Sequence, residues 1–331
     1  MRTRTLGRNG PTVSALGLGT MGMTGFAGAP GMYGPVDQDE AVATIHRALE
    51  LGVNFIDTAE VYGPYSNEEL VGRALKGRRD QAVLATKFGF RIDGSGKIAG
   101  MDGSPDNARR AVDESLRRLD IDHIDLWYLH RLDPAVPIEE SVGAMADTVQ
   151  AGKVRWLGLS EISAATLTRA CNTHPITALQ SEYSLWERNL ERELVPACEA
   201  LGVTIVPYCP LGRGFLGGDI ASADVLPDDD YRRIDPRYSA ENHPRNQVIL
   251  EVLETVAERH SISKAQVALA WLLHRNENVV PIPGTKRRRY VEENAAAADI
   301  DLDADDLALL DSCDRVSGAR YTEASLATID R

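Results

Sequence analysis

The sequence feature that most constrains the fold is a repeated alternation of short, β-branched apolar runs with longer stretches of helical periodicity. We count eight such runs in the 331 residues, each followed by a helical pattern. Parallel neighbouring strands need a long return connection, usually a helix. Eight units of this kind close into a barrel, whereas five or six form an open doubly wound sheet. The pattern therefore predicts an α/β protein with a (β/α)8 TIM barrel. A Rossmann-like open sheet is the alternative if one or two runs are buried helix segments. The runs are 13–19, 53–58, 82–88, 124–130, 154–160, 176–182, 203–209 and 279–284.

Two of the expected helices carry recognisable start signals. Ser66, with Glu69 three residues later, has the form of a capping box at the start of 66–77. Ser104 is followed by Pro105, which suits the first position of a helix over 104–119. The other helices expected between the first seven runs are 39–52, 137–152, 163–173 and 190–202.

Three segments depart from a minimal barrel, which we expect to form a single domain over 1–331. Residues 4–13 predict a short hairpin with Asn9-Gly10 at its turn, placed to cover the barrel floor. Residues 213–246 are rich in Pro, Gly and Asp and lack periodicity, and loops of that length usually bind ligands or act as lids. Residues 302–331 begin with a helical pattern and end irregularly, which indicates a C-terminal extension.

Charge and composition exclude several classes of function. The 36 Lys and Arg against 49 Asp and Glu give a net charge of -13, a field that repels nucleic acid and anionic membranes. The four cysteines are widely scattered without CxxC spacing, so we expect neither a zinc site nor another metal site. The N-terminus has no apolar segment of a signal peptide, and no run approaches ~20 apolar residues. We therefore expect a cytoplasmic protein that binds neither membrane nor nucleic acid.

Two glycine motifs fit the G-x-G-x-x-G pattern, at 17–22 and at 212–217. A dinucleotide fingerprint needs a helix that opens at the motif, and both motifs run instead into Gly- and Pro-rich loops. We therefore set the Rossmann interpretation aside. The backbone amides of the second motif could still wrap a pyrophosphate, because bare amides in a glycine-rich turn form an anion site, although the base of a flexible lid is an equally good interpretation.

Polar residues suited to chemistry end several of the expected strands. Asp57 ends the second strand, Lys87 the third and His130 the fourth, and Tyr62 lies in the loop after Asp57. In a barrel the carboxyl ends of the strands converge on the face that carries the active site. Taken singly, Asp57 could cap a helix, Lys87 could extend to solvent and His130 could be a core residue. Together at strand ends, these residues predict an active site.

The chemistry of these side chains suggests their roles. A Lys87 ammonium beside the Tyr62 hydroxyl favours the phenolate, so we expect it to lower the pKa of Tyr62, while Asp57 keeps Lys87 charged. His130 can hydrogen-bond a carbonyl oxygen and polarise it. A tyrosine held in this way can donate a proton to a developing alkoxide, which suits the reduction of an aldehyde or ketone.

Seven motifs, in order along residues 1 to 300, resemble the aldo-keto reductase superfamily, and most closely its bacterial and plant branches. They are LGVNFIDTAEVYG, ATKFG, YLHRLDP, VRWLGLSE, LQSEYSLWER, VPYCPLGRGFLGG and PIPGTKRRRYVEEN. The resemblance implies a (β/α)8 barrel that reduces carbonyl compounds with NADPH. It places the catalytic tetrad of the family on Asp57, Tyr62, Lys87 and His130.

The same resemblance implies a cofactor site along the barrel top. Ser160 and Gln180 match the residues that hold the nicotinamide carboxamide, and Tyr208 matches the aromatic residue that stacks on the ring. The residue after Ser160 is often Asn in the family, but here it is Glu161. Further cofactor contacts are expected from the first strand end, from Asp57 and from the pyrophosphate segment: Gly19, Thr20, Met21, Pro210, Leu211, Gly212, Arg213 and Gly214.

The adenosine end is implied at residues 284–294. Gly284, Thr285, Lys286 and Arg288 resemble the 2′-phosphate site, and Glu293 and Asn294 the adenine contacts. Many relatives carry an Arg four residues before that Asn, where this chain has Tyr290, so Arg287, Arg288 and Arg289 all remain candidates. A basic cluster that opens a helix in an acidic protein fits a phosphate, which favours NADPH and NADP+ over NADH.

The substrate is expected to be a small carbonyl compound, bound by a mostly apolar pocket that favours aldehydes and hydrophobic ketones. Two other functions stay open: a class I aldolase with a Schiff base on Lys87, and a regulatory subunit that binds NADPH without turnover. No long apolar edge indicates a large interface, so we expect a monomer or a weak homo-oligomer. The expected pocket residues are Met21, Met23, Phe26, Met32, Tyr33, Tyr62, Phe88, Trp127 and His130.

Overall fold

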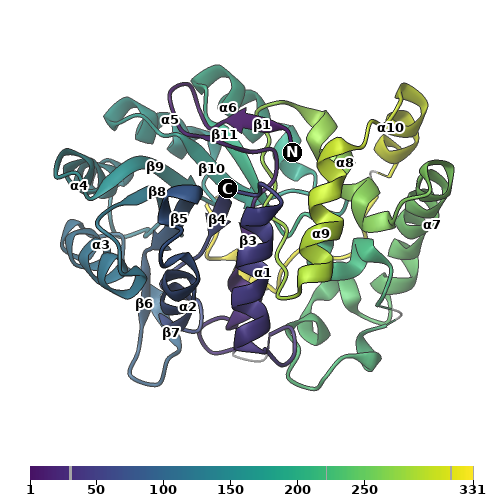
Figure 1. The fold of residues 1–331 in the computed structure, drawn as a ribbon, viewed down its shortest axis with the longest axis horizontal. Helices are drawn as coiled ribbons and strands as arrows, with labels where there is room; N and C mark the ends of the chain where they lie inside the picture. The colour runs from purple at the N-terminus through teal and green to yellow at the C-terminus, as the bar shows by residue number, and fades with distance from the viewer. Residues whose placement is uncertain (30–31, 221, 314, 331) are drawn as a thin grey trace.

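A barrel of parallel strands surrounded by helices forms the centre of the protein (Figure 1). The computed structural model describes residues 1–29, 32–220, 222–313 and 315–330. Seven strands pair in parallel in the order β11-β10-β9-β8-β5-β4-β3. Their bounds are β3 Leu18–Gly19, β4 Phe55–Asp57, β5 Val83–Phe88, β8 Ile124–Leu129, β9 Val154–Ser160, β10 Ala178–Glu182 and β11 Thr204–Tyr208.

The eighth run, 279–284, closes the barrel without forming a regular strand. The amides of Val280 and Ile282 donate to β11, at Ile205 O and Pro207 O, both at 2.9 Å. On the other side this run accepts hydrogen bonds from Gly17 and Gly19 beside β3. Pro281 and Pro283 have no N–H, so the segment can make only part of a strand ladder. The expected (β/α)8 barrel is confirmed. Residues 279–284, which we call the eighth stave, take the place of its eighth strand and are held by isolated β-bridges.

The helices lie close to where the periodicity placed them. Ser104 caps α3 by accepting a hydrogen bond from the Asn107 amide, as expected. The predicted capping box of α2 is wrong, because Ser66 is already inside the helix and its hydroxyl donates to Gly63 O. Tyr65, at φ 67°, precedes the helix instead. The helix bounds are α1 Gln38–Glu50, α2 Ser66–Leu75, α3 Pro105–Leu119, α4 Ile138–Gln150, α5 Ala164–Thr173, α6 Leu194–Leu201, α7 Asn242–His260, α8 Lys264–Arg275, α9 Arg288–Ala296, α10 Ala304–Asp311 and α11 Glu323–Leu326.

Two hairpins flank the barrel. The expected N-terminal hairpin pairs β1 (Thr3–Thr5) with β2 (Thr12–Ser14), so the first apolar run is divided between β2 and β3. Leu6 of its turn is fully buried with the residues that fill the barrel, and the Gly7 amide donates to Thr204 at the start of β11. The hairpin therefore covers the floor, as predicted. A second hairpin, β6 (Phe90–Ile92) with β7 (Ile98–Met101), follows β5 and was not expected from the sequence.

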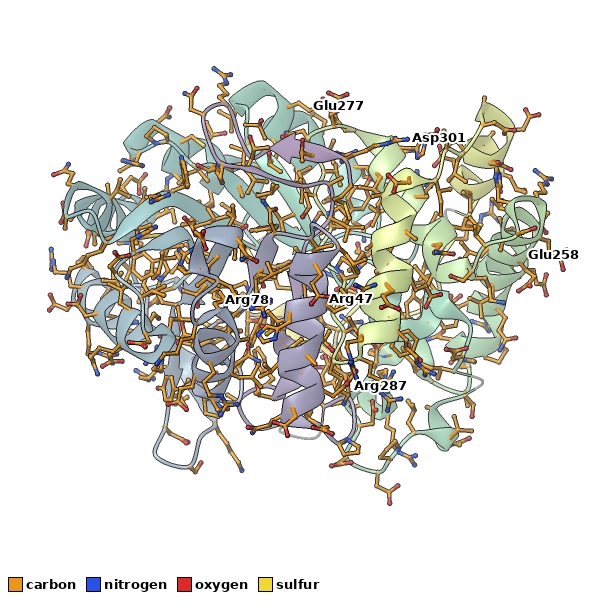
Figure 2. All side chains as sticks on the ribbon, in the orientation of Figure 1. Arg47, Arg78, Glu258, Glu277, Arg287 and Asp301 are labelled. Atoms are coloured by element: carbon orange, nitrogen blue, oxygen red, sulfur yellow. The ribbon has the colours of Figure 1, made fainter. Side chains whose placement is uncertain are left out.

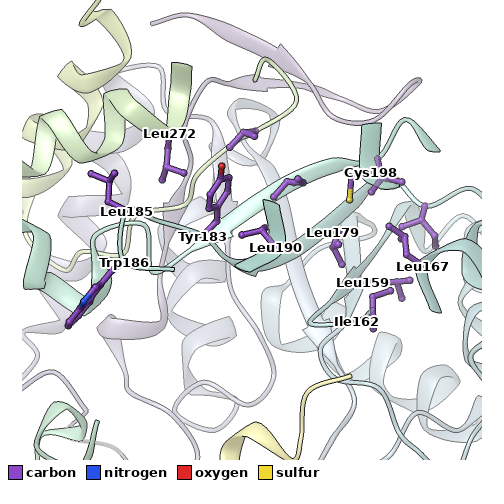
Figure 3. Packing of buried hydrophobic residues seen from close by; sticks show 14 of the residues in the cluster. Leu159, Ile162, Leu167, Leu179, Tyr183, Leu185, Trp186, Leu190, Cys198 and Leu272 are labelled. Atoms are coloured by element: carbon purple, nitrogen blue, oxygen red, sulfur yellow. The ribbon is translucent and has the colours of Figure 1, made fainter. Parts of the chain in front are cut away.

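Alternation along each strand divides the buried side chains into an inner and an outer layer. The inner layer fills the barrel and includes Phe55, Ala85, Leu126 and Val206. A larger outer layer lies between the strands and the helices, and Figure 3 shows part of it around Leu179. The core thus holds the strands rigidly, and the site is built on their ends.

The segments above the barrel are more ordered than their composition suggests. The described part of 212–238 contains a kinked turn at 212–217 and short 3-10 helices over 223–225, 231–234 and 236–238, and α7 begins at Asn242, so the predicted loop 213–246 ends earlier than expected. The C-terminal extension contains α10 and α11. Residues 221, 314 and 331 of these two segments lie outside the described residues.

Candidate active site

The structure brings Asp57, Tyr62 and Lys87 together at the carboxyl ends of β4 and β5. These strands are hydrogen-bonded neighbours, and Asp57 pairs in register with Ala85, two residues before Lys87. Lys87 Nζ donates to Asp57 Oδ1, to Thr58 O at 2.8 Å and to the Tyr62 hydroxyl at 3.1 Å. The ammonium therefore uses all three of its protons inside the site.

Burial dominates the electrostatics of this group. It raises the pKa of Asp57 and lowers that of Lys87, while the attraction between the two opposes both shifts. Burial, followed by the charge of Asp57, also raises the pKa of Tyr62 well above its usual value. The expectation that Lys87 lowers the pKa of Tyr62 is therefore wrong for the net shift, because burial of the hydroxyl, followed by the charge of Asp57, raises that pKa. Tyr62 is a neutral phenol that keeps its proton.

His130 follows β8 and faces Tyr62 within a buried aromatic cluster. The two rings lie 5.9 Å apart, and the Phe90 ring lies 4.9 Å from His130. Phe26, expected at the pocket, contacts Tyr62 with ring centroids 5.9 Å apart. Burial, followed by the charge of Lys87, lowers the pKa of His130 well below its usual value, so the imidazole is neutral. Its Nδ1 is buried without a hydrogen-bond partner in the described chain.

Gln180, in the middle of β10, and Ser160, at the end of β9, lie next to this cluster. Gln180 Nε2 donates to Asp57 Oδ2 at 2.8 Å, so the glutamine orients the carboxylate that holds Lys87. Ser160 Oγ accepts from Arg131 Nη1 at 3.1 Å, and the same nitrogen donates to His130 O. Sequence reasoning quoted the YLHRLDP motif but did not single out Arg131; its position directly after a strand-end histidine was the available signal.

The geometry argues against a Schiff-base lysine. Such a lysine must present a neutral amine to a substrate carbonyl. Lys87 is fully buried and its three hydrogen bonds go to Asp57, Thr58 and Tyr62. The lowered pKa of Lys87 would suit a Schiff-base lysine, but these three hydrogen bonds hold the amine away from a substrate carbonyl.

Arg213, expected at the cofactor pyrophosphate, is held in a buried ion network. Its guanidinium donates to Asp235 at 2.7 Å and to Glu182 at 3.0 Å, and its side chain is 2% exposed. Residues 212–214 all have positive φ, which folds the glycine-rich segment tightly under these contacts. The pyrophosphate contact expected of residues 211–214 therefore stays a prediction for their backbone amides, since two carboxylates bind the Arg213 side chain.

Tyr208 and Glu161 both contact the C-terminal extension. The Tyr208 hydroxyl lies 2.8 Å from that of Tyr321, and Arg320 forms a two-pronged ion pair with Glu161. The Glu161 carboxylate also accepts a hydrogen bond from the Glu182 amide. Glu161 therefore points to the extension, and sequence reasoning, which questioned only its cofactor contact, missed this pairing.

The basic residues after the eighth stave differ in the contacts that their side chains make. Lys286 Nζ donates to the carbonyl oxygens of residues 33 and 34. Arg288 is bound by the Glu40 carboxylate through both its backbone and its side chain. The Arg289 guanidinium lies over the Tyr290 ring. The Arg287 side chain has no partner in the described part of the chain, and Figure 2 shows it projecting below α9. Arg287 is thus the freest cation of the three candidates.

Several other expected cofactor residues have structural contacts. Thr20 is buried, and its hydroxyl bonds Asp57 O and Asn67. Glu293 O accepts a hydrogen bond from Gln266, and Asn294 is buried in α9. The remaining members of the expected set lie at three places: Gly19 at the end of β3 with Met21 after it, Pro210, Leu211, Gly212 and Gly214 after β11, and Gly284 and Thr285 at the end of the run 279–284 and just after it.

Two residues that were predicted to line the substrate pocket lie elsewhere in the structure. Phe88 and Trp127 stack with centroids 4.2 Å apart and are fully buried in the outer layer. Lys87 points into the barrel, and its neighbour Phe88 must point out, because side chains alternate along a strand. These two rings therefore pack against helices, and their assignment to the pocket is wrong.

Met23 lines a cavity of about 390 Å³. The cavity lies between the start of α1, the start of α2 and the loop near Asp229, and the tetrad does not contribute to its wall. Tyr33 is placed nearby by its carbonyl contact with Lys286 and by the Arg232 guanidinium over its ring.

The described residues lack two further features, a membrane-spanning helix and a metal-binding cluster. No helix there is long and apolar enough to cross a membrane. No group of three or more His, Cys, Asp or Glu side chains in that part of the chain is arranged to hold a metal ion.

Comparison with known proteins places this architecture among reductases. Residues 15–315 match the model of the Aldo/keto reductase family. A probable aldo-keto reductase from Glycine max is 44% identical over 303 residues, which cover 91% of this chain and 86% of that protein. A glycerol dehydrogenase from Gluconobacter oxydans superposes with a TM-score of 0.86 at 31% identity, covering 94% of each chain. An aldo/keto reductase from Klebsiella pneumoniae, solved in complex with NADP and acetate, has a TM-score of 0.71 at 29% identity, covering 97% of this chain and 99% of that one.

Proposed function

Because the chain belongs to the aldo/keto reductase family, we propose that it reduces aldehydes and ketones to alcohols with NADPH, with Tyr62 as the proton donor. The observation that carries the proposal is the contact of Lys87 Nζ with both Asp57 and the Tyr62 hydroxyl at the barrel mouth. A family relative solved with NADP supports the class of cofactor.

Each side chain has a defined task in this proposal. The cofactor, when bound, supplies a hydride to the carbonyl carbon. Tyr62 gives its hydroxyl proton to the carbonyl oxygen, which becomes the alcohol. Lys87 then stabilises the phenolate left on Tyr62, because its ammonium already bonds that oxygen. Asp57 holds Lys87 in place, and Gln180 holds Asp57.

His130 acts as a neutral donor in this scheme. Its lowered pKa keeps the imidazole uncharged at neutral pH, so one ring nitrogen carries a proton and the other does not. A neutral imidazole can hydrogen-bond the substrate oxygen without competing with Tyr62 to supply the proton. The aromatic rings of Phe26 and Phe90 exclude water from this position.

The residues of the adenosine end fit a 2′-phosphate. Burial, and then the like charges of Arg287 and Arg232, lower the pKa of Lys286. Lys286 therefore lies close enough to these two guanidinium groups to be repelled by them. The Arg287 side chain is unpartnered in the described chain, so a phosphate dianion would relieve this repulsion. Glu40 is unfavourable for phosphate binding, because its carboxylate already accepts a hydrogen bond from the Arg288 amide in the first turn of α9. We expect Lys286 and Arg287 to hold the phosphate in preference to Arg288.

The test compares wild-type protein with Tyr62→Phe, following NADPH absorbance with a panel of aromatic and aliphatic aldehydes. Tyr62→Phe keeps the ring and removes the proton, so we expect turnover to fall about 10²- to 10⁴-fold with little change in NADPH affinity. Wild-type protein that binds NADPH but turns over no carbonyl compound would favour the regulatory-subunit alternative. A Tyr62→Phe variant as active as wild type would overturn the assigned proton donor.

A further inference from the structure

The last part of the chain forms a strap across the carboxyl ends of the strands. We define the strap as residues 317–330. It starts beside α7, where the Ser317 amide donates to the Asn246 side chain at 2.8 Å. It ends at the start of α5, where Asp330 accepts hydrogen bonds from the Ser163 amide at 3.0 Å and from its hydroxyl at 2.9 Å. Both anchors lie outside the tetrad, so the strap is tied to two sides of the barrel mouth.

Between its two ends the strap is held by a partly buried ion pair. Arg320 donates through Nη1 to Glu161 Oε1 at 3.0 Å and through Nη2 to Glu161 Oε2 at 2.5 Å. The Glu161 side chain is 1% exposed, and its residue has φ 54°, a left-handed conformation that few non-glycine residues adopt. The Asp330 amide also donates to Glu161 O. Glu161 is therefore the main contact between the strap and the barrel.

Residues of the barrel hold the Glu161 carboxylate in position for this pairing. Its Oε1 accepts from the Ser181 hydroxyl at 3.1 Å and from the Glu182 amide at 2.9 Å. Burial alone would raise the pKa of Glu161, but the charges of Arg320 and Arg131 lower it to about 2. The carboxylate is thus ionised and fixed in place at neutral pH.

The strap also contacts the cofactor segment directly. The Tyr321 hydroxyl lies 2.8 Å from that of Tyr208, which ends β11 and follows the pattern of the residue that stacks on nicotinamide. The Tyr321 ring lies 4.7 Å from the Arg213 guanidinium, which is bound by Glu182 and Asp235. Arg320 and Tyr321 are adjacent, so a movement of the ion pair also moves the contact with Tyr208.

We propose that Glu161 and Arg320 form a latch that docks the strap over the nicotinamide end of the site, and that the docked strap positions Tyr208 and slows cofactor release. The cofactor part of this inference rests on the proposed function. Glu161 and Arg320 act here as positioning residues, because neither touches the tetrad. In the family pattern Asn is common at the position of Glu161, so the latch is a property of this chain's own pair of residues.

The first measurement is hydrogen exchange of the strap in the cofactor-free protein. In Glu161→Gln the ion pair is lost with little change in shape, and we expect the amides of 317–330 to exchange about tenfold faster than in wild type. The control is Glu139→Gln, which makes the same chemical change in a two-pronged pair with Arg169 on the surface. The control should leave exchange of the strap unchanged. If Glu161→Gln does not fold, Arg320→Gln breaks the same pair from the other side.

The second measurement is the rate of NADPH release, followed by stopped-flow fluorescence in the same proteins and in Tyr321→Phe. We expect release about tenfold faster in Glu161→Gln, and faster in Tyr321→Phe although its ion pair is intact. Unchanged strap exchange in Glu161→Gln would overturn the latch. Faster exchange with unchanged NADPH release would overturn its coupling to the cofactor. A wild-type protein that does not bind NADPH would overturn the proposed function instead, and the exchange rates would still decide whether the latch exists.

Discussion

Replacing Lys87 by methionine removes the central charge of the site while keeping a side chain of similar length. Lys87 and Asp57 are both buried, at 0% and 2% side-chain exposure. Removing one partner of a buried pair leaves an uncompensated charge, which typically costs about 3 to 5 kcal/mol. Burial already raises the pKa of Asp57, so this carboxyl can take up a proton and reduce the cost. We expect Lys87→Met to lower the free energy of unfolding by about 3 kcal/mol, at the lower end of that range.

The double variant Asp57→Asn with Lys87→Met separates stability from catalysis. It removes both charges, so the free energy of unfolding should return to within about 1 to 2 kcal/mol of wild type, because no buried charge is left unpaired. Turnover should stay about 10²- to 10⁴-fold low in both variants, since nothing stabilises the Tyr62 phenolate.

Denaturant titration and steady-state kinetics check both expectations for Lys87 and Asp57. The control is Lys264→Met, which removes a surface pair with Glu254 and should cost no more than about 1 kcal/mol. A Lys87→Met protein that turns over aldehydes at the wild-type rate would refute the role of Lys87. A double variant less stable than Lys87→Met alone would refute the electrostatic account of its cost.

Four shorter predictions test other parts of the structure. Lys286→Ala should weaken NADPH binding about tenfold or more and leave NADH binding unchanged in fluorescence titration, and equal losses for both cofactors would contradict a 2′-phosphate site. Glu40→Gln should tighten NADPH but not NADH binding, because it removes a carboxylate from the start of α9, and a weaker NADPH complex would contradict this. Burial, followed by the charge of Glu68, raises the pKa of Glu60 to about 8. Between about pH 4.5 and 8 the folded state therefore holds a proton that the unfolded state releases, and the free energy of unfolding of the wild-type protein should fall as pH rises through this window. Glu60→Gln should flatten that slope in denaturant titrations across this window, and an unchanged slope would assign it to another group. Trp127→Ala should cost about 3 to 5 kcal/mol of unfolding free energy while KM for aldehydes stays near wild type, and a large rise in KM would return Trp127 to the pocket.

The positions of three tetrad residues could be predicted from the sequence. Asp57, Lys87 and His130 each lie at or near the end of an apolar run, and parallel strands bring such ends to one face of a barrel. The position of Phe88 could have been predicted as well, because strict alternation places it opposite Lys87. Our assignment of Phe88 to the pocket used its apolar character and ignored that alternation.

Other features depend on partners far apart along the chain. The sequence placed Arg213 in the expected pyrophosphate segment, but only the structure shows that Glu182 and Asp235 bind its side chain. The Glu161–Arg320 pair spans 159 residues, and the net shift of the Tyr62 pKa depends on how deeply its hydroxyl is buried.

The sequence by itself determined the alternation of barrel strands and helices and the identity of the residues at the strand ends. Both depend on local periodicity and on the general rule that parallel strands share a direction. Only the tertiary structure decided which charges pair, which cation near Lys286 is free and where the strap lies. These choices depend on distances between segments that have no fixed separation in sequence, and on the burial that sets the strength of each charge.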